Sequence, residues 1–343
     1  MSDNKFISIC IPSYNRPQTL KNLLYSIDAN CRAYIEVVIC EDCSPKREQI
    51  REVVEAFKKK NLFEILYIEN EYNYGFDKNL RALIKNAKGE YIIYMGDDDI
   101  FVKENLIQFI TFLKNNKHLG YVLKTWQMLY PNGSVEYFNY FKNNCFFEPG
   151  IDSFIALYRI SVFISGFTFR REYAIPFLDI DEFDGTLLFQ MYLLSEITLK
   201  YPSAFFSVPL TQQSYQKTDV PHFGSSKSEK KLYTPGDITV LNSINFMKGH
   251  FKILKYIDEK YSINATESIR RDFSKYSYRI LAIQRKRGRI EFFKYHKLLS
   301  KEIKINNTIF YYIYLFFLII FGDKICDKMI VLIKKIIGRT PSQ

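Results

Sequence analysis

The first hundred residues alternate between short apolar runs and amphipathic segments. Apolar runs rich in strand-forming residues cover positions 6–11, 35–40, 63–68 and 91–95, and their length predicts strands, of which those over 6–11 and 91–95 are expected to be buried. Apolar residues at helical spacing between these runs predict helices over 17–28, 47–60 and 77–87. The alternation predicts an α/β fold with right-handed crossovers, in which helices cover both faces of a largely parallel sheet.

The pattern continues less regularly beyond residue 100. Apolar runs over 121–129, 162–169 and 204–208 predict further strands, and 187–194 predicts a largely buried helix. From about residue 237 the apolar spacing becomes helical, over 238–261, 265–285 and 290–303. We therefore expect an α/β domain over residues 1–235, a helical extension over 236–304 and a separate apolar segment over 305–343.

Polar residues follow each predicted strand of the first hundred residues, over 12–16, 41–44, 73–78 and 96–99. In a parallel sheet the carboxyl ends of the strands meet at one edge, and ligands bind there. The sequence has neither of the glycine-rich loops that hold phosphates in dinucleotide-binding and P-loop proteins. A nucleotide bound through a metal-coordinated diphosphate is the simplest interpretation.

Three consecutive carboxylates, Asp97, Asp98 and Asp99, follow the fourth predicted strand. Adjacent carboxylates repel one another, and a divalent cation removes the cost of ionising them together. Mg²⁺ is commonly held by one or two carboxylates and by substrate phosphates. Since residues i and i+2 of an extended segment point the same way, we expect Asp97 and Asp99 to face one ion and Asp98 to face elsewhere. The alternative is a solvated acidic turn that caps the helix predicted to begin near Lys103.

Composition narrows the possible classes of function. Of the 343 residues, 47% are hydrophobic and 17% aromatic, which excludes a disordered chain. The net charge of +11 brings nucleic acid and anionic membrane surfaces into consideration. No nucleic-acid-binding motif accompanies that charge. A nucleotidyltransferase also uses aspartates and a metal, but it needs a glycine- and lysine-rich N-terminal loop that this sequence lacks.

The six cysteines are scattered, and the N-terminus leads into a strand without a signal peptide. Both observations favour a cytoplasmic protein with reduced thiols. Cys40 and Cys43 have the spacing of a redox motif. However, Cys40 completes an apolar strand and no helix begins directly after it, which disfavours a redox role.

Five motifs resemble those of one enzyme family in their order and spacing. They are Ile9 to Arg16, Val38 to Ser44, Asn73 to Gly75 with Asn79, Ala87 to Ile92, and Gly96 to Asp99. The first hundred residues are similar to family 2 glycosyltransferases with the GT-A fold, and most similar to abequosyltransferase-like enzymes of the bacterial envelope. The resemblance implies a nucleotide-sugar-binding domain with a mostly parallel mixed sheet, followed here by an α-helical domain.

The resemblance also implies the chemistry. It implies an inverting, metal-dependent transfer of a sugar from a nucleotide diphosphate donor to a saccharide acceptor, in the synthesis of a surface polysaccharide such as O-antigen, capsule or lipooligosaccharide. Uridine diphosphate sugars are the commonest donors in the family, and a cytidine-linked donor is the alternative. The implied cofactor is Mg²⁺ or Mn²⁺, which stabilises the departing diphosphate as a Lewis acid. Nucleic acid is not expected as a partner.

Roles of individual residues follow from the matching positions. The resemblance implies a nucleotide-binding set of Pro12, Tyr14, Arg16, Glu41, Asp42, Asn73, Gly75, Asn79, Asp97 and Asp98. Tyr14 would lie near the base or ribose, and either Glu41 or Asp42 would accept a hydrogen bond from the base. Most members have two aspartates at that pair, so Glu41 leaves open which acid reads the base. Asn79 either binds the nucleotide or bonds the backbone, and Gly75 either approaches the ligand or supplies a turn.

The resemblance further implies the metal ligands and the catalytic base. The metal ligands would be Asp97 and Asp99, with Asp99 as the direct ligand. The family's base is an aspartate just before a helix of this region, which implies Asp184, with Glu182 as second choice. The alternative for Asp184 is an ordinary helix N-cap.

Several other residues are candidates for the same site. His222 lies in a polar segment, 212–233, which we interpret as a mobile lid over the nucleotide. His222 either ligates the metal or a phosphate, or is merely exposed. Trp126, the single tryptophan, either stacks on a sugar or packs in the core. Arg170 and Arg171 either meet a phosphate or form a solvated pair.

The end of the chain carries two apolar segments. Residues 308–321 form an uncharged run of fourteen, short of the ~20 that span a bilayer. In residues 325–337 four charged residues interrupt the apolar positions. This pattern predicts helices that lie in the surface of an anionic membrane, at the inner face of the cell membrane, which fits a lipid-linked acceptor. The alternative is a helix hairpin packed in the protein's own core. We expect that removing the residues after Lys304 releases the protein from the membrane.

Overall fold

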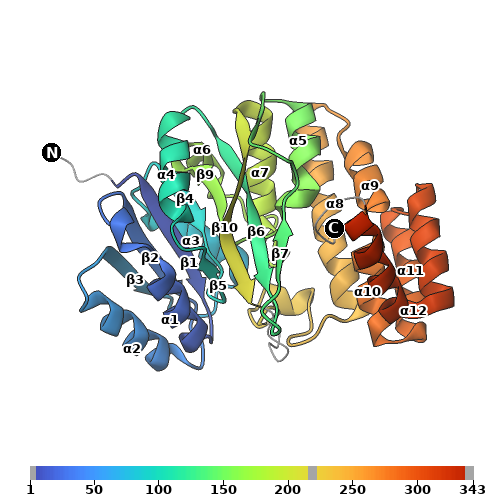
Figure 1. Ribbon diagram of the computed structural model, residues 1–343, viewed down its shortest axis with the longest axis horizontal. Coiled ribbons are helices and arrows are strands. Elements are labelled where there is room, and N and C mark those ends of the chain that lie inside the picture. Colours follow the sequence, from blue (N-terminus) through green and yellow to red (C-terminus); the bar gives the residue numbers. More distant parts are fainter. Residues whose placement is uncertain (1–4, 215–221, 337–343) are drawn as a thin grey trace.

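The computed structural model describes residues 5–214 and 222–336. Its strands are β1 (Ile7–Ser13), β2 (Ile35–Glu41), β3 (Glu64–Glu69), β4 (Tyr91–Tyr94), β5 (Asp99–Phe101), β6 (Tyr121–Leu129), β7 (Val135–Phe138), β8 (Cys145–Phe147), β9 (Phe167–Arg170) and β10 (Ser203–Ser214). They form one mixed sheet in the order β3-β2-β1-β4-β9-β6-β10-β5, with β7 beside β6 and β8 beside β10 (Figure 1).

The first four predicted strands form the parallel part of this sheet. β1 pairs in parallel with β2 and with β4, and β2 pairs in parallel with β3. Beyond them β9 runs antiparallel between β4 and β6, while β6 and β10 are parallel. The predicted α/β class with a mixed sheet is confirmed. The sheet is less parallel than predicted, because five of its nine strand pairings in the described residues are antiparallel.

Helices cover both faces of the sheet because successive strand residues point to opposite sides. The helices of the α/β part are α1 (Pro17–Ser26), α2 (Arg47–Lys58), α3 (Phe76–Asn86), α4 (Asn105–Asn115), α5 (Ile151–Tyr158), α6 (Arg171–Ala174) and α7 (Phe189–Lys200), with single turns η1 (Ala29–Cys31), η2 (Arg159–Ser161), η3 (Ile175–Phe177) and η4 (Glu229–Lys231). On one face α1, α2 and α4 share a core with Ile9 and Ile39. On the other face α3, α5 and α7 share a core with Cys10 and Val38.

Several predicted boundaries after residue 95 were wrong, and some short strands were not predicted. Residues 162–166 are irregular, so the strand predicted over 162–169 is limited to β9. β10 continues to Ser214 and includes Gln212 and Gln213, well beyond the predicted end at residue 208. β5, β7 and β8 were not predicted, since each has at most four residues. So short a run does not distinguish a strand from other structure by its periodicity.

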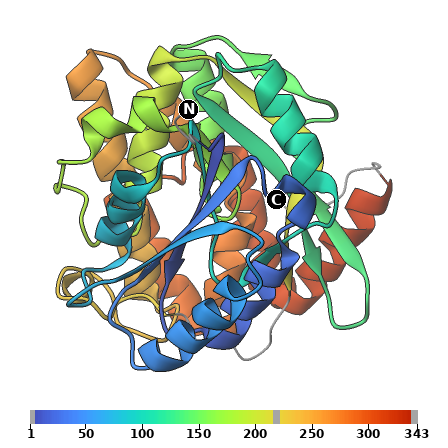
Figure 2. The same ribbon diagram turned by 90° about the vertical axis from the view of Figure 1, so that its left-hand side faces the viewer.

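The C-terminal part is helical, as predicted. It consists of α8 (Val240–Tyr261), α9 (Thr266–Lys275), α10 (Tyr278–Arg287), α11 (Arg289–Leu298), η5 (Leu299–Ile303) and α12 (Ile309–Ile336). These helices lie at the opposite end of the molecule from α2, behind the sheet in the view of Figure 2. The single helix predicted over 265–285 is interrupted between α9 and α10. α12 is broken at Gly322, whose φ of 71° and ψ of 176° are not helical, so the two predicted apolar segments are two helices joined at that glycine.

The C-terminal helices share a core with the α/β part. The cluster that contains Cys10 and Val38 also contains Ile244 of α8, Leu281 of α10 and Leu318 of α12. Apolar packing is therefore continuous across residue 235. Within α12, the stretch Ile309–Leu332 is long and apolar enough to cross a membrane by length and composition alone, and 17% of its most apolar window is buried.

His250 of α8 lies in this shared core. Phe246 and Phe273 pack against its ring, and Tyr158 Oη lies 3.3 Å from its Nδ1. Burial lowers the pKa of His250 to about 3, whereas an unfolded histidine has a pKa of about 6.5. Between pH 7 and 5 the unfolded chain therefore binds a proton that the folded protein does not, and the free energy of unfolding falls as the pH is lowered.

We expect this histidine to cost about 2 kcal/mol of stability between pH 7 and pH 5. Urea unfolding of the wild type and of His250→Phe at both pH values measures the difference. The variant should lose less stability than the wild type over this interval. An equal loss in both proteins would show that His250 titrates normally in the fold.

Candidate functional site

A cavity of about 610 Å³ opens at the carboxyl ends of β1, β2 and β4. All four polar clusters that follow the first strands contribute to its wall, as their common edge of the sheet requires. The cavity extends past the sheet to Arg159 of η2 and Arg279 of α10. It is therefore bounded by the α/β part on one side and by the C-terminal helices on the other.

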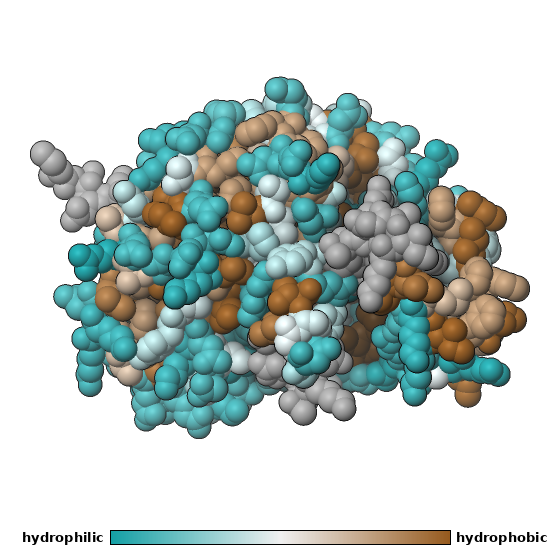
Figure 3. Space-filling view, in the orientation of Figure 1, coloured by the Kyte–Doolittle hydropathy of each residue, from teal (hydrophilic) through white to brown (hydrophobic). Residues whose placement is uncertain are grey.

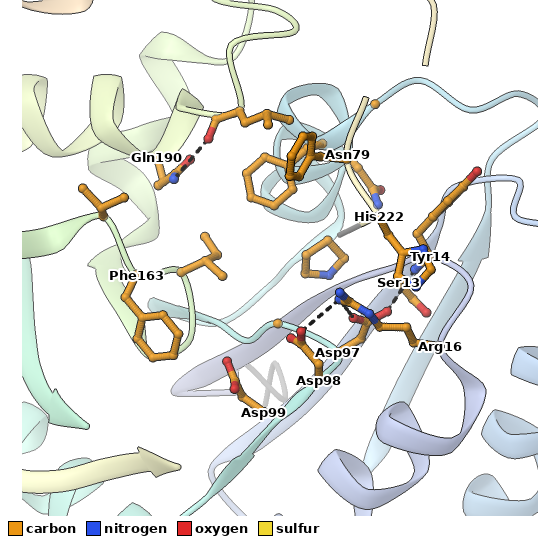
Figure 4. A pocket seen from close by; sticks show the side chains of 18 of the residues that line it. Ser13, Tyr14, Arg16, Asn79, Asp97, Asp98, Asp99, Phe163, Gln190 and His222 are labelled. Carbon is orange, nitrogen blue, oxygen red and sulfur yellow. Dashed lines mark hydrogen bonds and ion pairs between the residues drawn. The ribbon is translucent and has the colours of Figure 1, made fainter. Parts of the chain in front are cut away.

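Asp97 and Asp98 form a turn at the floor of the cavity, and Asp99 begins β5 (Figure 4). We call Asp97, Asp98 and Asp99 together the acid turn. Asp97 accepts hydrogen bonds from the backbone N–H of Tyr14 and from Arg16 Nη1, both at 3.0 Å. Asp98 contacts the same Arg16 Nη1 at 3.1 Å. The expectation from strand alternation is wrong here, because residues 97 and 98 form a turn and Asp97 is directed to Tyr14 and Arg16.

Asp99 is the carboxylate of this turn that best fits a cation. Its Oδ2 accepts a hydrogen bond from Ser165 Oγ, while its Oδ1 is buried with no hydrogen-bond partner among the described residues. Burial, together with the charge of Asp98, raises the pKa of Asp99 to about 8. Burial also raises the pKa of Asp97 to about 6, against the opposing effect of Arg16. An anionic Asp99 is thus costly in this position unless a cation lies beside it.

A cation at Asp99 would need ligands from outside the protein. In residues 5–214 and 222–336, no three His, Cys, Asp or Glu side chains are grouped so that they could hold a metal. Asp98 and Asp99 could together supply two carboxylates, and a diphosphate and water would complete the coordination of Mg²⁺ or Mn²⁺. This donor set is the one expected for a metal that binds with a nucleotide.

Glu41 does not line the cavity, although its neighbour Asp42 does. The Glu41 carboxylate is buried and accepts hydrogen bonds from the N–H groups of Cys43 and Ser44, at 3.1 and 2.7 Å. It also pairs with Arg47 Nε at 2.5 Å. Glu41 therefore holds the loop after β2, and of these two acids only Asp42 lines the cavity.

Asp42 also shapes the loop before α3. It accepts hydrogen bonds from the N–H groups of Tyr74 and Gly75, at 2.9 and 2.8 Å. Burial raises the pKa of Asp42. Gly75 has a φ of 90°, and a Cβ there would lie 2.5 Å from Ser226 Oγ. Both a turn and a close approach therefore require glycine at position 75.

Pro12, Tyr14, Asn73 and Asn79 all line the cavity. Asn73 Nδ2 donates to Ser225 Oγ at 3.1 Å, and its Oδ1 is buried with no partner within the described parts of the chain. Asn79 Nδ2 instead donates to a backbone carbonyl of β2 at 3.0 Å. Of these two asparagines, Asn73 is the one with an atom available for a ligand.

The segment predicted as a lid, 212–233, is not a single loop. Residues 212–214 belong to β10, and 215–221 lie outside the described residues. Residues 222–233 fold back onto α3, where Glu229 accepts hydrogen bonds from the N–H groups of Phe76 and Gly224, at 2.8 and 3.0 Å. Ser226 and Glu229 also bond each other's backbone N–H. This is a capping box, a signal visible in the sequence as S-x-x-E.

His222 reaches the cavity from this folded segment. Its ring lies edge-on to Tyr14, with 6.4 Å between ring centroids, above the Arg16 side of the acid turn (Figure 4). It lines the cavity together with Phe223 and Ser225. His222 is therefore a wall of the predicted nucleoside region.

The predicted bases, Asp184 and Glu182, do not belong to the residues that line the cavity. Asp184 pairs with Arg81 Nη2 at 2.5 Å and with Lys78 Nζ at 3.5 Å. Glu182 is directed to Lys252, with its Oε1 3.6 Å from Nζ. Sequence position before a helix thus does not bring either carboxylate to the site in this structure.

The N-cap alternative for Asp184 is also wrong. α7 begins at Phe189, and its N-terminus is capped from another element, α3. The Asp77 carboxylate accepts hydrogen bonds from the N–H groups of Leu187 and Phe189, at 3.0 and 2.9 Å. Burial raises the pKa of Asp77 to about 7. Because Asp77 lies more than a hundred residues before α7 in the chain, the sequence around the start of α7 does not indicate this cap.

Arg170 and Arg171 are likewise absent from the cavity lining. Arg170 Nε contacts Glu172 at 2.5 Å, and Arg171 Nε donates to the carbonyl of Ile84 at 3.2 Å. Both arginines therefore have structural partners, and a phosphate contact at the cavity is not available to them.

A stack of aromatic rings forms the far end of the cavity. Trp126 lies between Phe138 and Phe163, with centroid distances of 3.5 and 4.4 Å. Lys124 Nζ lies 4.6 Å from the centre of the Phe163 ring, and Arg279 Cζ lies 5.2 Å from that of Phe138. Burial lowers the pKa of Lys124 to about 7. Trp126 packs in this stack and also lines the cavity. Packing in the core therefore does not exclude stacking on a sugar.

Several lining residues were not singled out from the sequence, and those with charged or amide side chains include Arg159, Gln190, Glu229 and Arg279. Glu229 belongs to the S-x-x-E signal described above. The other three come from elements that are distant in sequence from the polar clusters. No pattern along the chain marks them.

Comparison with known proteins supports the family that the sequence motifs indicate. Residues 8–172 match the sequence model of glycosyl transferase family 2. Abequosyltransferase RfbV of Salmonella typhimurium is 33% identical over 107 residues, which cover 31% of this chain and 32% of that protein. The UDP-Glc:alpha-D-GlcNAc-diphosphoundecaprenol beta-1,3-glucosyltransferase WfgD of Escherichia coli is 27% identical over 134 residues, 39% of this chain and 50% of that protein. The match thus spans about a third to a half of these relatives.

The fold extends the similarity to most of the chain. The crystal structure of Staphylococcus aureus TarS, residues 1–349 in complex with UDP-GlcNAc, superposes with a TM-score of 0.53 at 17% identity, over 88% of this chain and 76% of that one. The fold and the site together define a GT-A protein with an aspartate turn at the carboxyl edge of its sheet. Within that class, the sequence of residues 8–172 matches glycosyl transferase family 2.

Proposed function

We propose that this chain transfers a sugar from a nucleoside diphosphate, a uridine diphosphate sugar in the first instance, to a saccharide acceptor in the synthesis of a bacterial surface polysaccharide. The observation that carries the proposal is the acid turn, which presents Asp98 and an oxygen of Asp99 that is unpaired within the described chain, inside a cavity large enough for a nucleotide sugar. The family of residues 8–172 and the names of RfbV and WfgD support the same class of reaction.

In this proposal the nucleoside lies between Tyr14, Asp42 and Asn73. Ser13 Oγ and Asn73 Oδ1 are buried there without a partner among the residues described. Buried polar atoms are normally satisfied, and a base and ribose would supply the missing hydrogen bonds. Asp42 is the acid that would accept a hydrogen bond from the base.

The diphosphate would lie over the acid turn. Asp98 and Asp99 would hold a Mg²⁺ or Mn²⁺ ion, which would supply a Lewis acid to stabilise charge on the departing diphosphate. Ser165 orients Asp99, because its hydroxyl donates to Asp99 Oδ2 and accepts from the N–H of Gly96 at 3.0 Å. Arg16 offsets the negative charge of the turn and places a cation beside the diphosphate.

The proposed inversion at the sugar carbon rests on the family resemblance. It requires a carboxylate that removes the proton of the acceptor hydroxyl. Asp184 would have to leave Arg81 and Lys78 to reach an acceptor in the cavity. The variant Asp184→Asn therefore distinguishes a base from a structural carboxylate.

The acceptor would enter at the aromatic end of the cavity. Trp126 and Phe163 offer apolar ring surface, and Arg159 and Arg279 bring positive charge to the same end. Such an end suits a saccharide that carries phosphate, as a lipid-linked saccharide does. WfgD, by its name, acts on a diphosphoundecaprenol-linked sugar, and this supports a lipid-linked acceptor here.

We also propose that α12 attaches the protein to an anionic membrane. Ile309, Ile313, Phe316 and Ile320 recur on one helical face and are 40 to 68% exposed. Figure 3 shows apolar side chains gathered over the C-terminal helices at the right-hand end of the molecule. The net charge of +11 favours anionic lipid headgroups. Attachment at this end would bring a lipid-linked acceptor to the side of the cavity that the C-terminal helices form.

A thermal-shift panel of UDP- and CDP-linked hexoses, with and without Mg²⁺ or Mn²⁺, tests the proposed function. A ligand at about a hundred times its dissociation constant stabilises the fold by about 2.7 kcal/mol. We expect stabilisation by one nucleotide class that requires the metal, and metal-dependent hydrolysis of the same nucleotide sugar. Salt-sensitive DNA binding without any nucleotide response would instead support a nucleic-acid-binding protein.

A further inference from the structure

Gln190 is a buried polar residue among the residues that line the cavity. It is the second residue of α7 and lines the cavity, yet it is only 3% exposed. Its Nε2 donates to the carbonyl of Leu187 at 3.4 Å. Its Oε1 is buried and has no hydrogen-bond partner in residues 5–214 and 222–336. An amide oxygen buried in this way is unfavourable unless a partner arrives from elsewhere.

The backbone around Gln190 is held by contacts from several elements. Leu187 has a φ of 67°, a left-handed conformation that a β-carbon disfavours. Asp77 of α3 fixes that conformation, because its carboxylate accepts from the N–H groups on both sides of the bend, at Leu187 and Phe189. Tyr233 Oη donates to the carbonyl of Thr186 at 2.8 Å. The position of Gln190 is therefore set before any ligand binds, which is how a site gains selectivity.

Apolar side chains line the same cavity as Gln190. They include Leu187, three residues before it in the chain, and Ile160, Val162 and Ile164. A single acceptor in an apolar wall discriminates between ligands that differ by one hydroxyl, because the wrong ligand leaves the buried acceptor unpaired.

The position of Gln190 relative to the acid turn indicates which part of the donor it meets. In Figure 4, Ser13, Tyr14 and Arg16 lie on one side of the turn, and Gln190 and Phe163 lie on the opposite side. A nucleotide sugar is linear, with nucleoside, diphosphate and sugar in that order. If the nucleoside lies beside Tyr14 and the diphosphate over the turn, the sugar extends toward Gln190.

We propose that Gln190 Oε1 accepts a hydrogen bond from a hydroxyl group of the donor's sugar, and so selects among sugars attached to the same nucleotide. This inference rests on the proposed function, because it takes the direction of the donor from it. It concerns the sugar alone, so its failure does not affect the assignment of the nucleotide site.

The test compares nucleoside diphosphate, nucleotide sugar and deoxygenated nucleotide sugar on the full-length protein. Titration calorimetry with UDP, CDP and their glucose, galactose and N-acetylglucosamine conjugates first identifies the preferred donor. Its monodeoxy analogues are then measured on the wild type and on Gln190→Met, which keeps the length of the side chain and removes the acceptor. Gln284→Met is the matched control, since Gln284 of α10 is also buried and does not line the cavity.

We expect the wild type to bind one deoxy analogue about 10- to 100-fold more weakly than the parent donor. Gln190→Met should bind parent and analogue equally, within about threefold, while binding the nucleoside diphosphate as the wild type does. Gln284→Met should keep the wild-type discrimination. Retained discrimination in Gln190→Met, with normal binding of UDP or CDP, would overturn the inference and leave the proposed function intact. If neither UDP nor CDP nor any conjugate binds the wild type, both proposals fall.

Discussion

Replacing Asp99 with asparagine is expected to lower kcat for sugar transfer by about 10²- to 10³-fold, the loss found when one electrostatic contact to a transition state is removed. Asparagine has the same shape and keeps an oxygen for the Ser165 hydroxyl, but it carries no charge for a cation. The loss should therefore fall on metal-dependent chemistry and leave the fold intact. Thermal unfolding without ligand should show a midpoint close to the wild type, and added Mn²⁺ with nucleotide should stabilise the variant less.

Asp184→Asn is the matched control for this prediction. It also removes a carboxylate of the region that the family resemblance implicates, but Asp184 contacts Arg81 and Lys78 outside the cavity. We expect the control to retain kcat within about tenfold, less than the 10²- to 10⁴-fold that a general base contributes. A deep loss in Asp184→Asn with full activity in Asp99→Asn would reverse both assignments. A deep loss in both variants would mean that the chain near Asp184 moves into the cavity when substrate binds.

The elements that could be predicted from the sequence are those whose apolar pattern has enough length to be distinctive. The strands near residues 7, 35 and 91 each carry a continuous buried run, and the helices between them bury one clear face. β3, near residue 64, lies at the edge of the sheet and its residues are half-buried or exposed. The elements that were missed are short. β7 has four residues and β8 has three, and both owe their existence to pairing with β6 and β10 rather than to their own composition. Such tertiary pairing overrides local preference.

The candidate site also has features that could be predicted from the sequence and features that could not. The polar clusters that follow the strands could be placed together because the carboxyl ends of parallel strands share an edge. The orientation of individual side chains could not be predicted. The alternation argument for Asp97 and Asp99 required an extended strand, and the chain turns there instead, so that Arg16 contacts Asp97 and Asp98. That Asp42 and not Glu41 lines the cavity could not be predicted either, because it depends on the pairing of Glu41 with Arg47.

Contacts between distant segments account for the remaining differences. Asp77 caps α7, which no residue near the start of α7 could have indicated. Gln190 of α7 and Arg279 of α10 reach the cavity through the tertiary packing of these helices, not because of any motif. The residues that set selectivity are thus less visible in the sequence than the residues that bind what all nucleotide sugars share.

α12 combines packing and exposure, and this changes how membrane attachment is best tested. Tyr311, Leu318 and Cys326 are buried against the protein. Arg285 Nε donates to the carbonyl of Leu318 at 3.0 Å, and Lys286 Nζ lies 3.0 Å from Asp327. Removing everything after Lys304 would strip part of the core, so a soluble truncated protein would not distinguish lost attachment from altered folding. Substitutions on the exposed face avoid this difficulty.

The triple variant Ile313→Ser, Phe316→Ser, Ile320→Ser is expected to reduce binding to anionic vesicles at least about tenfold, since each buried CH₂ contributes about 0.8 kcal/mol to membrane affinity. All three side chains are exposed, so the fold should persist, as its unfolding midpoint would show. Flotation with phosphatidylglycerol-containing vesicles measures the loss.

Tyr25→Ser, Ile151→Ser, Ile175→Ser is the control for this variant, because it removes equally exposed apolar side chains from the α/β part. If the C-terminal helices carry the attachment, the control floats with the vesicles as the wild type does and the α12 variant stays in solution. If the two triple variants float equally, the apolar face of α12 does not bind lipid. Because the cavity lies on the α/β part with one side formed by α10, the α12 variant should still hydrolyse the nucleotide sugar in solution and should lose transfer to a membrane-embedded acceptor alone.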